Sequence, residues 1–209
     1  MVRLRLTARP IPVTLYHLLR LSQQNRTIPV SNTKQIAFMH AYEKCHQPFV
    51  RYCSALAYGK MDAEDLVQDV LLSTFQQFET IEKKHELLHY LVRAARFRAI
   101  SVWRKRRRSE AICEKQAARL RERGATSEVL VDVKIMYEAL DRLPNDQREA
   151  LVLFEISGLP MAEIAAIQSC SEGTVKTRVS RARATLRGQL DGRAKAQPEV
   201  LHALKTLLL

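Results

Sequence analysis

The feature that most constrains this chain is a basic segment near its C-terminal end, residues 171–187. Its apolar residues recur at helical spacing and form one narrow stripe, made by Val175, Val179, Ala182 and Leu186. The opposite side carries hydroxyl and guanidinium groups, with further cations on its flanks. A helix that packs through such a stripe and exposes such groups fits the major groove of DNA. The candidate DNA contacts are Thr174, Lys176, Thr177, Arg178, Arg181 and Arg183.

The residues before this segment complete a helix-turn-helix pattern. Residues 159–168 indicate a short helix with Pro160 at its first position, where a missing N–H costs nothing. Residues 169–171 then form a tight turn, and Ser171 can cap the basic helix. Residues 144–157 predict a further helix upstream. The plainer alternative is a three-helix domain with a solvated basic face. It is disfavoured because the turn, the apolar stripe and the basic face all fit a helix-turn-helix.

The charge of the chain indicates a polyanionic partner. The 209 residues carry a formal net charge of +12, and the length suggests one or two domains. The charge is clustered, because one central stretch holds eight cations with no acid among them. These cations are Arg93, Arg96, Arg98, Arg104, Lys105, Arg106, Arg107 and Arg108.

The cysteines and the hydropathy pattern argue against metal sites and membrane insertion. None of the four cysteines forms a CxxC pair. Cys45 beside His46 could suggest a metal site, but reduced, buried thiols in a cytosolic protein are the commoner explanation. No apolar run reaches the roughly 20 residues of a membrane span, and Pro10 and Pro12 interrupt the only candidate signal core. We therefore expect a cytoplasmic protein without metal or cofactor.

The chain as a whole is expected to be all-α. No strand pattern and no internal repeat is evident, and two helical regions flank a charged stretch in which Gly124, Thr126 and Ser127 mark a flexible point. We therefore predict two small helical domains joined by a flexible linker. The expected segments are a partly disordered N-terminal extension (1–33), a first domain (34–107), the linker (108–128), a helix-turn-helix domain (129–190) and a C-terminal tail (191–209).

One helix of the first domain, residues 61–78, is expected to carry an ordered acidic face. Asp62, Asp65 and Asp69 align on the side opposite its apolar residues, with Gln68 at the border. In a strongly basic protein such a face suits a basic protein surface better than nucleic acid. Asp62 also complements the dipole at the start of the helix, but this does not account for Asp69.

A second helix of this domain, residues 86–106, combines aromatic and basic residues on one side. Tyr90, Arg93, Phe97 and Arg104 lie opposite its apolar stripe. Aromatic rings interleaved with arginines suit unstacked bases and a phosphate backbone. The alternative is that Tyr90 and Phe97 complete a core between helices, and the sequence leaves this choice open.

These residues resemble a known family. Residues 61–72 resemble the start of region two of bacterial sigma factors, and residues 87–108 resemble its later, promoter-melting part. Residues 140–186 resemble region four. Because only a short linker joins them and no region three is present, the layout is similar to that of the extracytoplasmic-function (group four) sigma factors. The resemblance covers about residues 35–190.

The resemblance implies an alternative sigma factor, which brings core RNA polymerase to promoters and promotes DNA melting. The implied partners are the largest and second-largest polymerase subunits, promoter double-stranded DNA, the melted non-template strand and an anti-sigma factor. Asp62, Asp65, Gln68 and Asp69 would face the clamp helices of the largest subunit. Tyr90, Arg93, Phe97, Arg104, Arg106 and Arg107 would meet the minus-ten element. Thr174, Lys176, Thr177, Arg178, Arg181 and Arg183 would meet the minus-thirty-five element.

The chain departs from the family pattern at four positions. Phe97 and Ser101 stand where asparagine and aspartate are usual, so we expect a different minus-ten preference. Gln168 and Ser169 stand in the helix-turn-helix where an apolar residue and glycine are usual. We therefore expect a strained or differently packed turn.

Two rival functions remain at the level of sequence. A helix-turn-helix regulator without the sigma role would need neither the acidic face nor the basic-aromatic helix. A nucleic-acid-processing enzyme would need metal-binding carboxylates, but Asp62, Asp65 and Asp69 lie at helical spacing on an open face without a cavity. No catalytic constellation is present in the sequence, so we expect a binding protein without catalysis.

Overall fold

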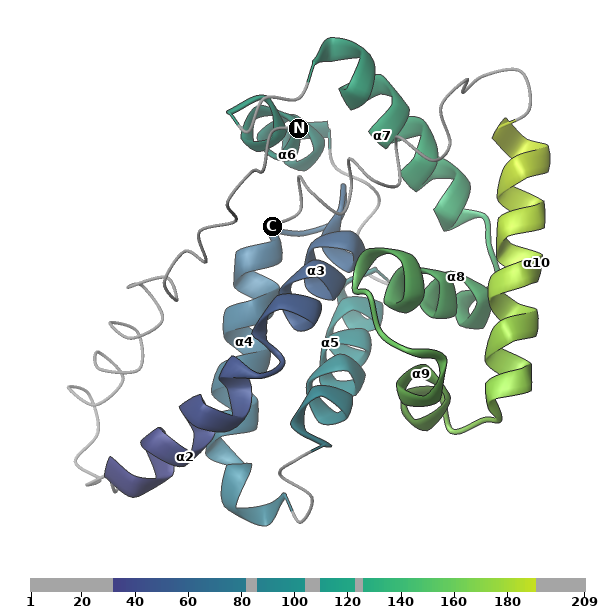
Figure 1. The fold of residues 1–209 in the computed structure, drawn as a ribbon. Coiled ribbons are helices and arrows are strands. Elements are labelled where there is room, and N and C mark those ends of the chain that lie inside the picture. Colours follow the sequence, from purple (N-terminus) through teal and green to yellow (C-terminus); the bar gives the residue numbers. More distant parts are fainter. Residues whose placement is uncertain (1–31, 82–85, 104–109, 123–125, 191–209) are drawn as a thin grey trace, which may run out of the picture.

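The computed structural model describes residues 32–81, 86–103, 110–122 and 126–190, and within these ranges the chain is helical with no strand. This confirms the expected all-α fold of two helical domains. In Figure 1, α2 to α5 form one group and α8 to α10 another, with α6 and α7 across the top. The predicted C-terminal tail, nearly all of the predicted N-terminal extension, and Arg104, Arg106 and Arg107 lie outside the described residues.

The first domain is built from α2 (Asn32–Glu43), α3 (His46–Ala57), α4 (Ala63–Gln76) and α5 (Leu87–Trp103), with a short 3-10 turn, η1 (Phe78–Thr80). Helices α3, α4 and α5 pack on one another, and α2 lies against α5 and η1. The predicted helix 61–78 is therefore shorter than expected, because its last aromatic residue lies in η1. There the Phe78 ring meets Phe38 edge to face, with centroids 5.2 Å apart, and closes the core.

The predicted flexible linker contains a helix, α6 (Glu110–Glu122). The Gln116 side chain fastens α6 to the loop after α3: its Oε1 accepts the Gly59 N–H at 2.7 Å, and its Nε2 donates to the Met61 carbonyl at 3.3 Å. Thr126, read from the sequence as part of a flexible point, caps the following helix by accepting the Val129 N–H at 3.4 Å. Because of the Gln116 hydrogen bonds and the Thr126 cap, the linker has more structure than its composition indicates.

The second domain consists of α7 (Ser127–Asp141), α8 (Asn145–Leu151) with its π-helical continuation η3 (Val152–Ile156), α9 (Met161–Gln168) and α10 (Glu172–Leu190). Helix α10 packs against α7, α8 and α9. The stripe expected from the sequence forms its buried side and consists of Val175, Val179, Ala182 and Leu186. Because that side is buried, the polar side of α10 is left facing outward.

The turn between α9 and α10 contains a strained residue. Ser169 has φ 52° and ψ 47°, the left-handed conformation that a side chain disfavours by roughly 1–2 kcal/mol. Two residues later, Ser171 Oγ accepts the Thr174 N–H at 3.2 Å and caps α10, as the sequence predicted. The turn therefore keeps the helix-turn-helix geometry with serine at a position that favours glycine.

Replacing Ser169 with glycine is expected to stabilise the protein by about 0.5–1 kcal/mol. Glycine removes the left-handed strain, and its greater freedom in the unfolded chain offsets part of that gain. The midpoint of urea unfolding measures the effect. Ser169→Ala, which keeps Cβ, is the control and should give no stabilisation; a glycine variant no more stable than the alanine variant would contradict this account.

Candidate nucleic-acid and protein interfaces

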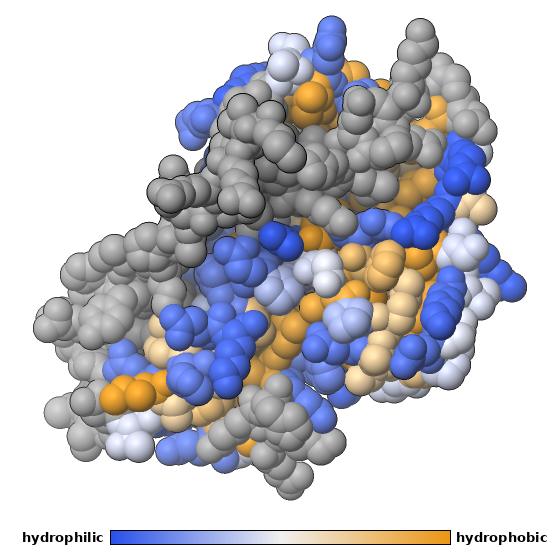
Figure 2. All heavy atoms as spheres, viewed as in Figure 1, coloured by the Kyte–Doolittle hydropathy of each residue, from blue (hydrophilic) through white to orange (hydrophobic). Residues whose placement is uncertain are grey.

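The outward side of α10 and the start of α8 enclose a shallow groove. Its floor and walls come from residues 144–147 of the α8 end and from residues along the first three turns of α10. Thr174, Lys176, Thr177 and Arg181 are exposed on or beside this groove. Figure 2 shows hydrophilic residues along the edge of the molecule that α10 forms in the same view. The groove thus offers hydroxyls and cations on a rigid helix, as contact with DNA requires.

The Arg178 side chain does not lie free on the exposed side of α10, in contrast to the expectation from the sequence. Its guanidinium folds back over the turn, where Nη2 lies 2.9 Å from Asp146 Oδ2 and Nη1 donates to Gln168 Oε1 at 2.8 Å. The side chain sits at the border of the buried stripe, so these two acceptors are within its reach. Arg183 is likewise turned toward the protein, where it pairs with Glu155 of η3. Both predicted DNA contacts therefore have partners inside the second domain.

The acidic face of α4 is only partly open. Asp65 and Asp69 are exposed, and Gln68 is half-buried. Asp62 is the N-cap of α4, where it accepts the Glu64 N–H at 3.0 Å, and its side chain is only 15% exposed. Of the four predicted residues, Asp62 is therefore a helix cap, Asp65 and Asp69 are exposed, and Gln68 is half-buried.

Two arginines already lie against this acidic face. Arg119 of α6 is 3.5 Å from Asp62 Oδ1 and 3.5 Å from Glu64 Oε2. Arg98 of α5 pairs with Asp69, with Nη2 at 2.6 Å from Oδ2. The face can therefore hold guanidinium groups, which is the chemistry expected of a basic partner surface.

Phe97 is an exposed aromatic residue of α5. Its side chain is 63% exposed, and the Arg96 guanidinium lies 5.6 Å from the ring centroid. Arg93, one turn before it, is exposed as well. Tyr90 is half-buried and donates its hydroxyl to Gln77 Oε1 at 2.6 Å. The alternative that Phe97 completes a core between helices is therefore wrong. Tyr90 is held in place by the hydrogen bond of its hydroxyl.

Glu149 of α8 is a residue to which the sequence drew no attention. It is 8% exposed and accepts hydrogen bonds from the Tyr52 hydroxyl, Arg96 Nη1 and Gln168 Nε2, each at 3.0 Å. Burial, and then the carboxylate of Glu149, raise the pKa of Tyr52 well above its usual value, so this hydroxyl stays protonated and donates. A glutamate in an amphipathic helix usually faces water, so helical periodicity gave no signal of this role.

Two further expectations concern metals and membranes. The part of the chain that the structure describes holds no group of three or more His, Cys, Asp or Glu side chains that could bind a metal ion. His46 Nδ1 lies 2.9 Å from the Tyr42 hydroxyl, and burial raises the pKa of the Cys45 thiol to about 12. Among these same residues, every helix is too short or too polar to span a bilayer.

Comparisons with known proteins agree with this architecture. Residues 41–109 match the Sigma-70 region 2 family, and residues 134–186 match Sigma-70, region 4. ECF RNA polymerase sigma factor EcfG of Rhodopseudomonas palustris is 34% identical over 140 residues, covering 66% of this chain and 77% of that protein. ECF RNA polymerase sigma factor SigX of Bacillus subtilis is 27% identical over 162 residues, covering 74% and 84%.

Two solved structures share the fold. The sigma factor RpoE of Bartonella quintana, in complex with the anti-sigma factor NepR, is 28% identical with a TM-score of 0.52, and the match covers 75% of this chain and 99% of that one. CnrH, in complex with the cytosolic domain of CnrY, is 23% identical with a TM-score of 0.57, covering 85% and 97%.

The fold and the two family matches thus define a transcription initiation factor with one region-two and one region-four domain. The chain belongs to the extracytoplasmic-function family of RNA polymerase sigma factors. The rival function, a helix-turn-helix regulator without the sigma role, does not account for the region-two match over residues 41–109.

Arg178 and Arg181 of α10 are expected to differ in their effect on stability. Arg178→Ala should lower the free energy of unfolding by about 1 kcal/mol, because it removes the bonds to Asp146 and Gln168 at a partly exposed site. Arg181→Ala should leave it within about 0.5 kcal/mol, since Arg181 is exposed. Urea unfolding measures both, and equal effects would contradict the bracing role of Arg178.

Proposed function

We propose that three helices of this sigma factor each bind a different partner. Helix α4 docks on a basic surface of core RNA polymerase, α10 enters the major groove of the minus-thirty-five element, and α5 holds the melted minus-ten element. The observation that carries the proposal is the separation of charge: in a chain of net charge +12, exposed acids gather on α4 and exposed cations on α10. Each face is matched to a partner of opposite sign.

On α4 the proposal rests on Asp65, Asp69 and the flanking Gln68 more than on Asp62. Asp62 already serves as the helix cap, whereas Asp65 and Asp69 lie one turn apart and are exposed. Carboxylates at this spacing can each meet an arginine of a partner helix. The clamp helices of the largest polymerase subunit are the proposed partner.

Reversing both carboxylates, Asp65→Lys with Asp69→Lys, is expected to abolish binding to core polymerase. Placing like charges together at an interface costs several kcal/mol. Co-purification with core enzyme measures binding, and circular dichroism checks the fold. The matched control is Glu43→Lys with Glu128→Lys, which makes the same charge change at two exposed acids of α2 and α7. Wild-type recovery of polymerase with the α4 variant would refute the docking face.

For the minus-thirty-five element we propose Thr174, Lys176, Thr177 and Arg181 as direct contacts. All four side chains are exposed, and the Thr177 hydroxyl is oriented by its bond to the Gly173 carbonyl at 2.9 Å. Arg178 and Arg183 would have to exchange their internal carboxylate partners for DNA. Surface pairs of this kind are worth about 0–1 kcal/mol, so the exchange is energetically accessible.

Arg181→Ala is expected to weaken promoter binding by one of two measurable routes. Loss of a base contact should cost about 1–3 kcal/mol and relax preference at one position, whereas loss of a phosphate contact should lower the salt slope by about one unit. Footprinting and salt titration on the upstream element distinguish these. Arg187→Ala, an exposed cation of α10 outside the groove, is the control. Equal effects of the two variants would rule out a specific role for Arg181.

For the minus-ten element we propose that Phe97 stacks on an unpaired base while Arg93 lies near the backbone. Phe97→Ala is expected to reduce open-complex formation by the loss of one stacking contact, about 1–3 kcal/mol, without affecting core polymerase binding. Permanganate reactivity of thymines near the start site measures the melting. Val131→Ala, another exposed apolar side chain, is the control. Unchanged reactivity in Phe97→Ala would mean that the ring takes no part.

We further propose that an anti-sigma factor binds this chain and that the chain acts, without catalysing a reaction itself, in the bacterial cytoplasm where polymerase meets the chromosome. Support comes from the similar sigma factor RpoE, whose structure was solved in complex with the anti-sigma factor NepR.

A further inference from the structure

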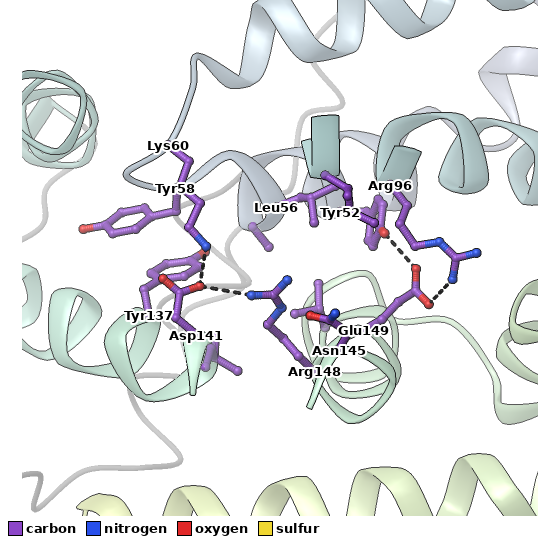
Figure 3. A pocket seen from close by; sticks show the side chains of 14 residues that line it. Tyr52, Leu56, Tyr58, Lys60, Arg96, Tyr137, Asp141, Asn145, Arg148 and Glu149 are labelled. Atoms are coloured by element: carbon purple, nitrogen blue, oxygen red, sulfur yellow. Dashed lines mark hydrogen bonds and ion pairs between the residues drawn. The ribbon is translucent and has the colours of Figure 1, made fainter. Parts of the chain in front are cut away.

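The two domains of this chain meet along a seam, formed where α3 packs against η3 and α5 against α9. A small cavity opens in the seam and is lined from both sides, as Figure 3 shows. At one end of it, Lys60 Nζ lies 2.6 Å from Asp141 Oδ1, and the rings of Tyr58 and Tyr137 stack with centroids 3.9 Å apart. The seam is therefore a built interface with polar and aromatic contacts.

Glu149 is the centre of the seam. Its carboxylate belongs to the second domain, but two of its donors, Tyr52 of α3 and Arg96 of α5, belong to the first. Removing a carboxylate from water is costly unless hydrogen bonds replace the lost hydration. The burial of Glu149 therefore depends on the first domain being docked.

The docked arrangement cannot serve both promoter elements at once. By their names, the minus-ten and minus-thirty-five elements lie about 25 base pairs apart, or about 85 Å along B-form DNA. A compact chain of this length has a radius of gyration of about 17 Å. Two domains in direct contact cannot reach across that distance, so the seam must open before both elements are bound.

Gln168 extends the hydrogen-bond network from the seam to α10. Its Nε2 donates to Glu149 Oε2 at 3.0 Å, and its Oε1 accepts from Arg178 Nη1 at 2.8 Å. The amide is thus bonded at both ends, to the carboxylate that holds the seam and to an arginine proposed to meet DNA. A rotation of Arg178 toward DNA would take away one of these bonds.

We propose that Tyr52, Arg96, Glu149 and Gln168 form an interdomain latch that holds the free chain closed, and that Gln168 couples the latch to Arg178. Closing the latch stabilises the arrangement in which Arg178 is turned inward, and opening it leaves Arg178 easier to turn toward DNA. The coupling is reciprocal, so binding of α10 to its element also favours opening. This inference rests on the proposed function, because only a DNA-reading α10 gives the coupling a consequence.

The test weakens the latch from the side of the first domain, which leaves the internal bonds of the second domain in place. The latch variant is Tyr52→Phe with Arg96→Gln in the full chain. The matched control is Tyr42→Phe with Arg98→Gln, which makes the same two chemical changes at bonds that stay within the first domain. Small-angle X-ray scattering gives the radius of gyration of each free protein. Fluorescence anisotropy gives affinity for a duplex that carries only the minus-thirty-five element of a promoter found by run-off transcription.

We expect the radius of gyration to rise in the latch variant and not in the control. We expect the latch variant to bind the duplex about fivefold more tightly than the control, the lower range of allosteric coupling. Tyr52→Phe alone, which changes one hydroxyl, should shift both quantities in the same direction and covers the case in which the double variant does not fold.

Other outcomes would overturn the latch, the coupling or the proposed function of α10. An unchanged radius in both Tyr52→Phe and the double variant overturns the latch. A raised radius with unchanged duplex affinity overturns the coupling through Gln168. A raised radius together with no duplex binding by any variant, wild type included, would leave the latch standing and reject the proposed function of α10.

Discussion

A carboxylate that leaves water must find hydrogen-bond donors, and the donors of Glu149 come from α3, α5 and α9, three helices other than its own. This requirement fixes how α8 lies on the first domain and how α9 lies beside α8. Buried ionic groups add little net stability compared with apolar packing. The network around Glu149 is therefore better understood as selecting one docking geometry out of the many that apolar surfaces of α3 and η3 would allow.

Three of the charged side chains proposed to meet polymerase or DNA already have ionic partners within the chain. Asp69 holds Arg98, Asp146 holds Arg178, and Glu155 holds Arg183. Such pairs are partly exposed and worth about 0–1 kcal/mol each. At these positions the proposed binding to polymerase or DNA would exchange one ionic partner for another.

Features that follow from spacing within one helix were predicted from the sequence. The orientation of side chains whose partners lie far away in the chain was not. The buried stripe of α10 and the Ser171 cap follow from spacing alone, and both were predicted. The inward turn of Arg178 depends on Asp146, 32 positions away, and the burial of Glu149 depends on Tyr52, 97 positions away. No pattern within one helix encodes such pairs. For Phe97 the sequence left two alternatives, because an aromatic residue on a helix suits a core and a stacking surface equally well.

The helix within the linker sets how far the two domains can separate. As a helix, the 13 residues of α6 span about 20 Å. The same residues fully extended span up to about 45 Å. Gln116 and Arg119 hold this helix against the first domain through the α3–α4 loop and the start of α4. If polymerase binds the acidic face as proposed, Arg119 would lose its carboxylate partners on α4. Unwinding of α6 would then lengthen the connection between the two domains by about 25 Å.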